Sequence, residues 1–259
     1  MNIQGKTILI TGGASGIGLE AVKQFLANGA KVIITGRSQA KLDEAKNLYP
    51  SITAIQSDVA NADDVQALFE QMSAMGGIDM LYNNAGINAS VGSKPMNFGA
   101  PNARHFSNAS DEMNINYLGV IRMNNTFMPM LASKPEAAII NTSSILSYVP
   151  ANVAASYSAS KVAVRFYTEA LQRHLKLINS PVKVFELLPP LVATDMAGSF
   201  EQGGAITPEK LVNGLVAGLK NDTYTIRVGM SKFMHIISRL SPRLASKLLN
   251  QTKINALLK

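Results

Sequence analysis

Short apolar runs alternate with longer segments of helical spacing along most of the chain. The first run, Lys6–Thr11, is rich in β-branched residues and predicts a buried strand. Apolar residues then recur at helical intervals over Leu19–Asn28, Gly29 is placed to end that helix, and Lys31–Thr35 predicts the next strand. The later predicted strands are Ile52–Gln56, Ile78–Tyr82, Ala137–Thr142, Val182–Leu188 and Thr223–Val228. The later predicted helices are Ser38–Leu48, Asp63–Ala74, Glu112–Leu131, Ser156–Ile178 and Pro208–Leu219.

Three stretches depart from this alternation. Residues 88–110 are rich in Gly, Pro, Ser and Asn and are long for a connection, so we interpret them as one wall of a binding pocket. Residues 193–207 are small and polar, which is typical of a mobile lid. From Met230 the helical spacing resumes, and Pro242 breaks it.

Composition bounds the class of protein. With 259 residues, 47% of them hydrophobic, the chain can bury one large core, so we expect a single domain over residues 1–259. No apolar run reaches the roughly 18 residues that a membrane span needs. The N-terminal residues lack a hydrophobic signal region, which predicts a cytoplasmic protein. There is no cysteine, and the three histidines show no ligand spacing, so we expect neither disulfides nor a metal site.

The net charge of +7 is placed unevenly. After Asp222 the sequence has no acidic residue, and the last 37 residues hold seven bases, whereas the rest balances 17 bases against 17 acids. This pattern indicates a neutral body with a basic C-terminal segment, residues 230–259, and no nucleic-acid partner. The segment fits an anionic membrane surface or an acidic partner. The alternative, which the sequence alone favours, is a C-terminal flap or oligomer contact with solvated lysines.

A glycine turn, Thr11-Gly-Gly-Ala-Ser-Gly-Ile-Gly18, lies between the first strand and the first helix. Glycines let backbone N–H groups approach a pyrophosphate at a helix N-terminus, so this context predicts dinucleotide binding rather than a plain tight turn. The second strand ends at Gly36, where an NAD site usually has a carboxylate for the ribose 2′-hydroxyl. Arg37 can clamp a 2′-phosphate, which favours NADP(H) over NAD(H); a solvated turn arginine is the alternative.

Tyr157 and Lys161 are four residues apart in a predicted helix and therefore share one face. An ammonium beside a phenol favours the phenolate, and lowering a tyrosine pKa from about 10 to about 7 needs roughly 4 kcal/mol. Such a pair would be a general acid–base near neutral pH, whereas an exposed helical pair is the alternative. Ser144 lies thirteen residues before Tyr157, after a predicted strand, at the sheet edge where open α/β folds bind ligands.

Two more motifs complete the pattern. Asn83-Asn-Ala-Gly86 follows the fourth predicted strand, and Leu188-Pro-Pro-Leu-Val-Ala-Thr194 follows the sixth. In identity, order and spacing the four motifs resemble those of the short-chain dehydrogenase/reductase family, over nearly the whole chain. Pro189, Val192 and Thr194 match that family's Asn-Pro-Gly-x-Val-x-Thr, while Leu188 and Pro190 depart from it.

The resemblance implies an α/β fold with a single doubly wound Rossmann-type domain, whose seven-stranded parallel sheet has helices on both faces. It also implies an oxidoreductase that transfers a hydride between NADP(H) and a small-molecule carbonyl or secondary alcohol, and a homodimer or homotetramer. The implied catalytic residues are Tyr157, Lys161, Ser144 and Asn116. The implied cofactor-binding residues are Gly12, Ser15, Gly16, Ile17, Gly18, Arg37, Asp58, Val59, Asn84, Ala85, Gly86, Tyr157, Lys161, Pro189, Val192 and Thr194.

The resemblance assigns a role to each catalytic position. Tyr157 gives or takes the hydroxyl proton, Lys161 lowers its pKa, and Ser144 bonds the substrate oxygen. Asn116 links a water chain to the lysine, and Asp58 meets the adenine amino group. The alternatives are that Asn116 is a cap or a helix-surface amide and that Asp58 only closes a turn.

A second hypothesis is a cofactor-sensing regulator that binds NADP(H) without chemistry. The presence of Ser144 together with Tyr157 argues against it, because a sensor needs neither.

Overall fold

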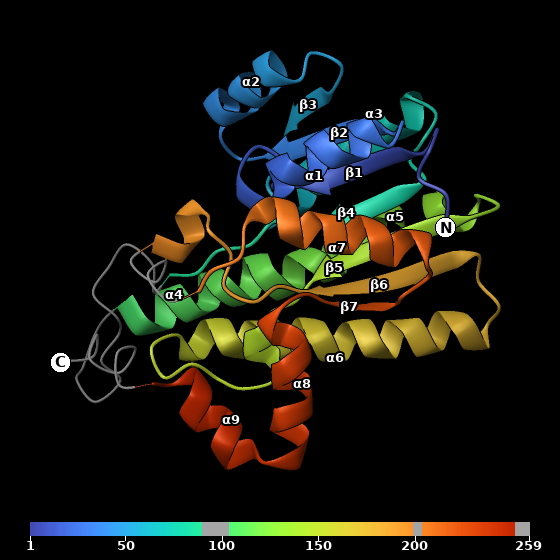
Figure 1. The fold of residues 1–259 in the computed structure, drawn as a ribbon. Coiled ribbons are helices and arrows are strands. Elements are labelled where there is room, and N and C mark those ends of the chain that lie inside the picture. The colour runs from blue at the N-terminus through green and yellow to red at the C-terminus, as the bar shows by residue number, and fades with distance from the viewer. Residues whose placement is uncertain (90–103, 199–203, 252–259) are drawn as a thin grey trace.

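The computed structural model of the chain describes residues 1–89, 104–198 and 204–251 (Figure 1). Seven parallel strands form one sheet in the order β3-β2-β1-β4-β5-β6-β7, which confirms the predicted fold class. The strands are β1 (Thr7–Thr11), β2 (Lys31–Gly36), β3 (Thr53–Gln56), β4 (Met80–Asn83), β5 (Ala137–Thr142), β6 (Val182–Leu188) and β7 (Thr225–Arg227). The α-helices are α1 (Gly16–Ala27), α2 (Gln39–Leu48), α3 (Ala62–Ala74), α4 (Arg104–Met113), α5 (Gly119–Ala132), α6 (Ala155–Leu177), α7 (Pro208–Lys220), α8 (Met230–Leu240) and α9 (Pro242–Leu249).

Helices cover both faces of the sheet, and each face has its own core. On β1, Ile8 and Ile10 point into the core beneath α1, α2 and α7, whereas Leu9 points into the core beneath α3, α5 and α6. This alternation explains why the strands are apolar throughout, since both faces of a parallel sheet are buried. Phe25 on α1 and Phe127 on α5 are fully buried, one on each face.

The predicted boundary between the loop 88–110 and the helix Glu112–Leu131 was wrong. Arg104–Met113 already forms α4, and a π-helical turn, η1 (Asn114–Leu118), separates it from α5. The Gly119 N–H donates to the Asn114 carbonyl five residues earlier, which adds one residue to the turn. Ser and Asn favour loops only weakly, so packing of α4 against α6 decides the outcome. Residues 90–103 of the predicted pocket wall lie outside the described residues.

The residues after β5 and the C-terminal helices pack together. A 3-10 turn, η2 (Ile145–Ser147), follows β5, and Met234 of α8 and Ala245 of α9 join its apolar cluster. The predicted helix break is confirmed, because α8 ends at Leu240 and α9 begins at Pro242. Within the described part of the chain, no helix combines the length and the apolar character that crossing a membrane requires.

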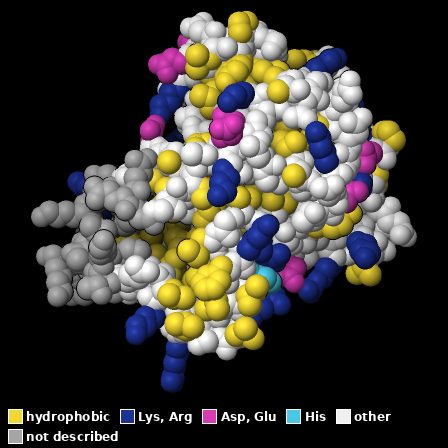
Figure 2. Space-filling model, viewed as in Figure 1, with side chains coloured by type: hydrophobic (Ala, Val, Ile, Leu, Met, Phe, Trp, Pro, Cys, Tyr) yellow, Lys and Arg dark blue, Asp and Glu magenta, His cyan; other side chains and the backbone are white. Residues whose placement is uncertain are grey.

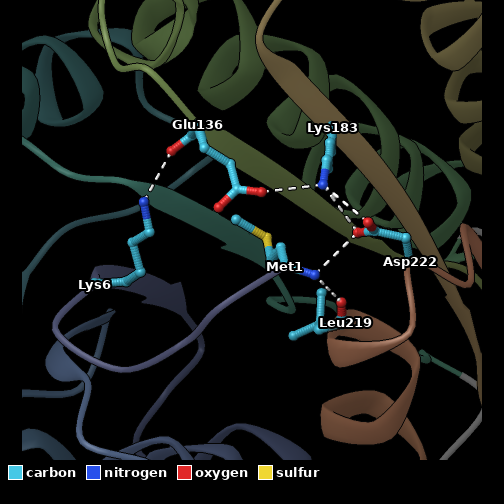
Figure 3. A network of polar contacts seen from close by, with 6 residues as sticks. All are labelled: Met1, Lys6, Glu136, Lys183, Leu219 and Asp222. Carbon is cyan, nitrogen blue, oxygen red and sulfur yellow. Dashed lines mark hydrogen bonds and ion pairs between the residues drawn. The ribbon is translucent and has the colours of Figure 1, made fainter.

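A polar network ties the amino-terminal edge of the sheet together (Figure 3). The Met1 amino group donates to the Asp222 carboxylate, just before β7, at 3.0 Å. Lys183 Nζ of β6 lies 3.0 Å from a carboxylate oxygen of Asp222 and 3.0 Å from one of Glu136, just before β5. This network lies at the sheet edge where the strands begin, opposite the edge that carries the predicted site residues.

Candidate active site

The carboxyl edge of β5 and the start of α6 bring Ser144, Tyr157 and Lys161 together. Ser144 caps η2 by accepting from the Leu146 N–H, and its side chain also acts on the Tyr157 phenol, whose pKa it lowers. Lys161 Nζ lies 5.6 Å from the centre of the Tyr157 ring, on the same helix face. The Lys161 ammonium donates to the Thr142 carbonyl at 3.0 Å, which fixes it at the end of β5. The helical spacing therefore juxtaposes the pair as the sequence predicts.

The electrostatics of this pair differ from the prediction. Burial raises the pKa of the Tyr157 phenol, the Glu112 carboxylate raises it further, and only the bond to Ser144 lowers it. Burial also lowers the pKa of Lys161 to about 8. The predicted lowering of the Tyr157 pKa by Lys161 was therefore wrong for the protein chain itself. Loss of hydration is the largest cause of the raised Tyr157 pKa, and the Lys161 ammonium donates to the Thr142 carbonyl instead of to the phenol.

Asn116 lies in the π-helical turn and is fully buried. Its Oδ1 accepts from the Ile87 N–H at 2.8 Å, and its Nδ2 donates to the Ile87 carbonyl at 2.9 Å and to the Ser160 hydroxyl at 3.0 Å. A Cβ added at Gly86 would lie 3.1 Å from Asn116 Oδ1 and 3.4 Å from Lys161 Nζ. Asn116 thus fastens the chain after β4 beside Lys161, and the extra residue of the π turn aims it there.

Glu112 is a residue that the sequence analysis missed. It is fully buried at the end of α4, and its Oε1 accepts from the Ala89 N–H at 2.8 Å. Its Oε2 has no hydrogen-bond partner among the described residues. The carboxylate acts on Tyr157 through space, raising its pKa. No motif signals this residue, because a single glutamate in a polar helix reads as solvated until the fold buries it.

The glycine turn and the chain after β4 form one close-packed unit. Asn84 Nδ2 donates to the carbonyls of Thr11 and Gly12, each at 3.2 Å, and the Thr11 hydroxyl accepts from the Ala85 N–H at 3.0 Å. A Cβ on Gly18 would lie only 2.1 Å from the Gly12 carbonyl oxygen, so this approach requires glycine. The predicted residues of the two motifs are therefore in direct contact.

The chain after β6 reaches the same turn. Gly16 has φ +52°, and a Cβ there would lie 3.2 Å from a methyl carbon of Thr194. Val192 forms a parallel bridge with Ile206, which joins the two ends of the predicted lid. The Pro189 carbonyl accepts from the Ile145 N–H at 2.8 Å, next to Ser144. Residues 199–203 of the predicted lid lie outside the described residues.

A hollow of about 330 Å³ lies beside the ends of β2 and β3. Arg37, Gln56, Asp58 and Asp64 are among its lining residues. Asp58 Oδ1 accepts from the Ala60 N–H at 2.9 Å, which closes the local turn. The other carboxylate oxygen of Asp58 takes no part in that bond. Arg37 is exposed, so its guanidinium is accessible to a ligand in this hollow.

Three further predicted residues lie near the glycine turn. Ser15 is exposed at the N-terminus of α1, and its hydroxyl makes no capping bond within the described chain. Ile17, on α1, packs against one core, and Val59 belongs to the other. Val59 lies close to α5, because a Cβ added at Gly119 would be 2.9 Å from its side chain. The structure thus places these two as packing residues behind the turn.

The residues present fit a dinucleotide cofactor. Glycines line the turn where added Cβ atoms would collide with backbone, and the first turn of α1, which the structure describes fully, has no acid to repel a phosphate. The adjoining hollow has room for a planar base and ends at the exposed Arg37. The described residues contain no group of three or more His, Asp or Glu side chains suited to a metal ion.

A doubly wound parallel sheet with a glycine turn after β1 and a Ser/Tyr/Lys cluster after β5 defines a nucleotide-dependent oxidoreductase. A profile of the short chain dehydrogenase family matches residues 6–204, so the chain belongs to that family. It is therefore an NAD(P)-dependent dehydrogenase/reductase that acts on CH–OH or C=O groups.

Individual relatives agree with this assignment. The chain is 36% identical over 228 residues to an uncharacterized oxidoreductase of Bacillus subtilis, DltE, covering 85% of this chain and 86% of that protein. A short chain dehydrogenase from Burkholderia cenocepacia, solved in complex with NADP, superposes with a TM-score of 0.83 at 28% identity, covering 97% of this chain and 100% of the other. A 3-ketoacyl-(acyl-carrier-protein) reductase from Brucella melitensis, complexed with NADH, gives 0.74 at 28% identity, covering 84% and 91%.

Proposed function

We propose that this protein reduces a small-molecule carbonyl, reversibly, with NADP(H) and with Tyr157 as the proton donor. The observation that carries the proposal is the clustering of three side chains after β5: Ser144 acts on the Tyr157 phenol, and Lys161 Nζ lies 5.6 Å from the phenol ring. A phenol whose pKa is raised stays protonated at neutral pH, which is the form that donates a proton to a carbonyl oxygen. The same group acts as the base, in its ionised form, when an alcohol is oxidised.

Each neighbour supports the proton transfer. The Ser144 hydroxyl, held at the end of β5, hydrogen-bonds the substrate oxygen and stabilises the charge that develops on it. Lys161, with a pKa lowered to about 8, supplies a cation beside the phenol and a donor for the nicotinamide ribose. Asn116 holds the chain after β4 against Lys161, and we assign it the link between that lysine and a water chain. When bound, the nicotinamide ring gives or takes the hydride.

Replacing Tyr157 with Phe tests this proposal. We expect Tyr157→Phe to reduce carbonyl turnover by about 10²–10⁴-fold, because the proton donor is lost. Binding of NADPH, followed by its fluorescence, should change little. Tyr167→Phe, on the same helix, is the matched control and should keep its activity.

Two outcomes would contradict the proposal. Turnover retained in the Tyr157→Phe variant would remove the phenol from the chemistry. An unaltered protein that binds NADPH yet oxidises none over a panel of carbonyl compounds would favour the cofactor-sensing alternative.

We also propose that NADP(H) is preferred, with Arg37 binding the 2′-phosphate. The support is an exposed guanidinium at the rim of the hollow and a glycine, Gly36, where a carboxylate would favour NAD. Arg37→Ala should raise the KM for NADPH by about tenfold, the loss of one charge-assisted contact, and leave the KM for NADH unchanged. Steady-state kinetics with both cofactors measures this. An equal change in the KM for NADPH and the KM for NADH would show that Arg37 does not bind the 2′-phosphate.

We further propose a homodimer or homotetramer that uses the outer face of α6. Val162 and Phe166, one helical turn apart on α6, are exposed, Phe166 by 66%, and Leu118 of the π turn is exposed as well. Exposed aromatic and aliphatic side chains on one long helix are typical of subunit contacts. Sedimentation of the protein before and after Phe166→Ser should show loss of the oligomer.

A further inference from the structure

The outer face of α8 and α9 carries a continuous apolar surface with bases beside it. Figure 2 shows hydrophobic side chains gathered where Figure 1 draws these two helices, with Lys and Arg side chains around them. We call this the α8–α9 surface. Its exposed apolar residues are Met230, Phe233, Ile236, Leu240, Leu244 and Leu248. Its exposed bases are Lys232, Arg239, Arg243 and Lys247.

The packing of the two helices does not use this surface. The opposite faces of α8 and α9 hold the helices to the body through Met234 and Ala245, which are buried with Ile145 and Val149. Ile236 and Leu240, one turn apart, remain 55% and 77% exposed. Apolar residues that lie together on a surface, and that the fold does not need, mark a site of contact with another apolar phase or molecule.

The charges indicate which contact this is. The chain has no acidic residue after Asp222, so no acid in either helix balances the bases. A second copy of the protein docked through the same surface would place bases against bases, which repel. Bases beside an apolar helical stripe fit a bilayer with anionic lipids, because the bases meet the phosphates while the apolar side chains enter the headgroup–acyl boundary.

The inner side of α9 also contacts the loop that leads to the candidate active site. Leu249, at the end of α9, belongs to the apolar cluster that includes Ala154 and Tyr157. Asn250 donates to the Pro150 carbonyl at 3.0 Å and accepts from the Asn152 N–H at 2.7 Å, in the loop that leads to Tyr157. A bilayer bound at the outer face of α8 and α9 would therefore be separated from the candidate site by these helices, whose inner face contacts the loop before Tyr157.

We infer that the α8–α9 surface docks this protein peripherally on an anionic lipid bilayer. The apolar side chains insert and the flanking bases contact lipid phosphates. This inference concerns binding and stands whether or not the proposed chemistry is correct.

Co-sedimentation of the full-length protein with large vesicles tests the inference. Vesicles of equal parts phosphatidylglycerol and phosphatidylcholine are compared with vesicles of phosphatidylcholine alone. We expect binding to the anionic vesicles only, and weaker binding when salt rises from about 0.1 M to about 0.5 M. Absence of binding, or equal binding to both vesicles, would overturn the inference.

Variants separate the two contributions. Lys232→Gln with Arg239→Gln should weaken partitioning by about 30-fold, since each base near an anionic surface contributes roughly a factor of five. Ile236→Ser with Leu240→Ser should weaken it by about tenfold or more, through loss of apolar insertion. All four positions are exposed, so the melting temperature should stay near that of the unaltered protein.

The matched control removes two exposed bases elsewhere. Lys31→Gln with Lys41→Gln makes the same change in net charge on β2 and α2, which lie at the other end of the molecule (Figure 1). It should bind vesicles as the unaltered protein does. An equal loss in this control would show unspecific attraction and overturn the inference.

Two further measurements identify the other occupants. Binding to soluble polyglutamate without binding to vesicles would indicate an acidic protein partner and refute the lipid. A self-association that Ile236→Ser with Leu240→Ser abolishes, again without vesicle binding, would indicate a second copy and refute it as well. Light scattering of the protein at several concentrations measures the second case.

Discussion

Glu112 places a buried carboxylate beside the phenol of Tyr157. Its Oε1 is held by the Ala89 N–H, so the side chain is fixed and its charge acts on the phenol in a site from which water is largely removed. The charge disfavours the phenolate and raises the pKa of Tyr157, adding to the effect of burial. Glu112 is thus a positioning and tuning residue for a reaction in which the neutral phenol donates a proton.

Replacing Glu112 with Gln should lower the pKa of Tyr157, because a negative charge near the phenolate disappears. In alcohol oxidation, which needs the phenolate, the acid limb of the kcat profile should therefore move to lower pH. Turnover at the optimum should change by less than about tenfold, since Gln keeps the bond to the Ala89 N–H. The pH dependence of kcat measures this shift.

The matched control is Asp111→Asn. Asp111 precedes Glu112 in the chain but is exposed, so solvent screens its charge and the profile should not move. Equal shifts in both variants, or a shift in neither, would contradict the role assigned to Glu112.

At the scale of single residues, the sequence predicts which side chains come into contact. It predicts less well how their surroundings shift their pKa values. The spacing of Tyr157 and Lys161 sets their shared face, and the end of β5 sets Ser144, because both are local consequences of helix and strand geometry. The direction of the Tyr157 pKa shift depends on burial and on Glu112, whose closeness arises only when α4 packs on α6. No local pattern contains that information.

At the scale of elements, the turn between β1 and α1 has no room for a larger side chain at Gly18. Gly18 lies so close to the Gly12 carbonyl that an added Cβ would approach it to 2.1 Å, and would approach Asn84 Nδ2 to 2.8 Å. The turn, the helix start and the chain after β4 therefore move together or not at all. A change at one point disturbs every surface that faces the dinucleotide.

Gly18→Ala should open this turn. We expect a loss of about 1–3 kcal/mol in the free energy of unfolding, the typical cost of overpacking, and weaker NADPH binding by tenfold or more, about 1.4 kcal/mol. Urea unfolding and fluorescence titration measure the two effects. Gly36→Ala is the control for stability, because its Cβ would meet only Leu42, at 3.8 Å, and should change the unfolding free energy by less than about 0.5 kcal/mol.

The positions of several strands could be predicted from the spacing of apolar residues along the sequence. The bounds of β5 and β6 match the prediction, because both are continuous apolar runs that are buried along almost their whole length. The π turn at Asn114–Leu118 does not follow from periodicity, since one extra residue in a helix leaves its composition unchanged. It is set by the hydrogen bonds of Asn116 to the chain after β4, which lies 29 positions away along the sequence.

At the scale of the whole molecule, the two edges of the sheet have different tasks. The carboxyl edge holds the candidate site, and the amino edge is closed by charge pairs that link Met1, Glu136, Lys183 and Asp222 (Figure 3). These pairs join segments that are up to 221 positions apart in the chain. Sequence alone did not indicate them, because charged residues at strand ends are common and their partners depend on strand order.

The network gives a stability prediction with a definite pH dependence. Asp222 adopts φ +50°, a conformation that Asn also tolerates, so Asp222→Asn removes the charge without straining the backbone. The Lys183 ammonium and the Met1 amine lower the pKa of Asp222. Because Asp222 is 41% exposed, we expect a loss of about 1 kcal/mol in the free energy of unfolding at neutral pH.

The sign of the effect follows from the lowered pKa. Because the pKa of Asp222 is lower in the folded than in the unfolded protein, its ionised carboxylate stabilises the fold above the unfolded-state pKa of about 3.9. This stabilisation is lost as pH falls through the folded-state pKa. The difference between the two proteins in urea unfolding should therefore shrink as pH falls below about 3.9. Glu169→Gln, which breaks the exposed pair with Arg173, is the control and should cost about 0.5 kcal/mol or less. A difference for Asp222→Asn that persists unchanged at low pH would show that packing, rather than charge, links the two ends of the chain.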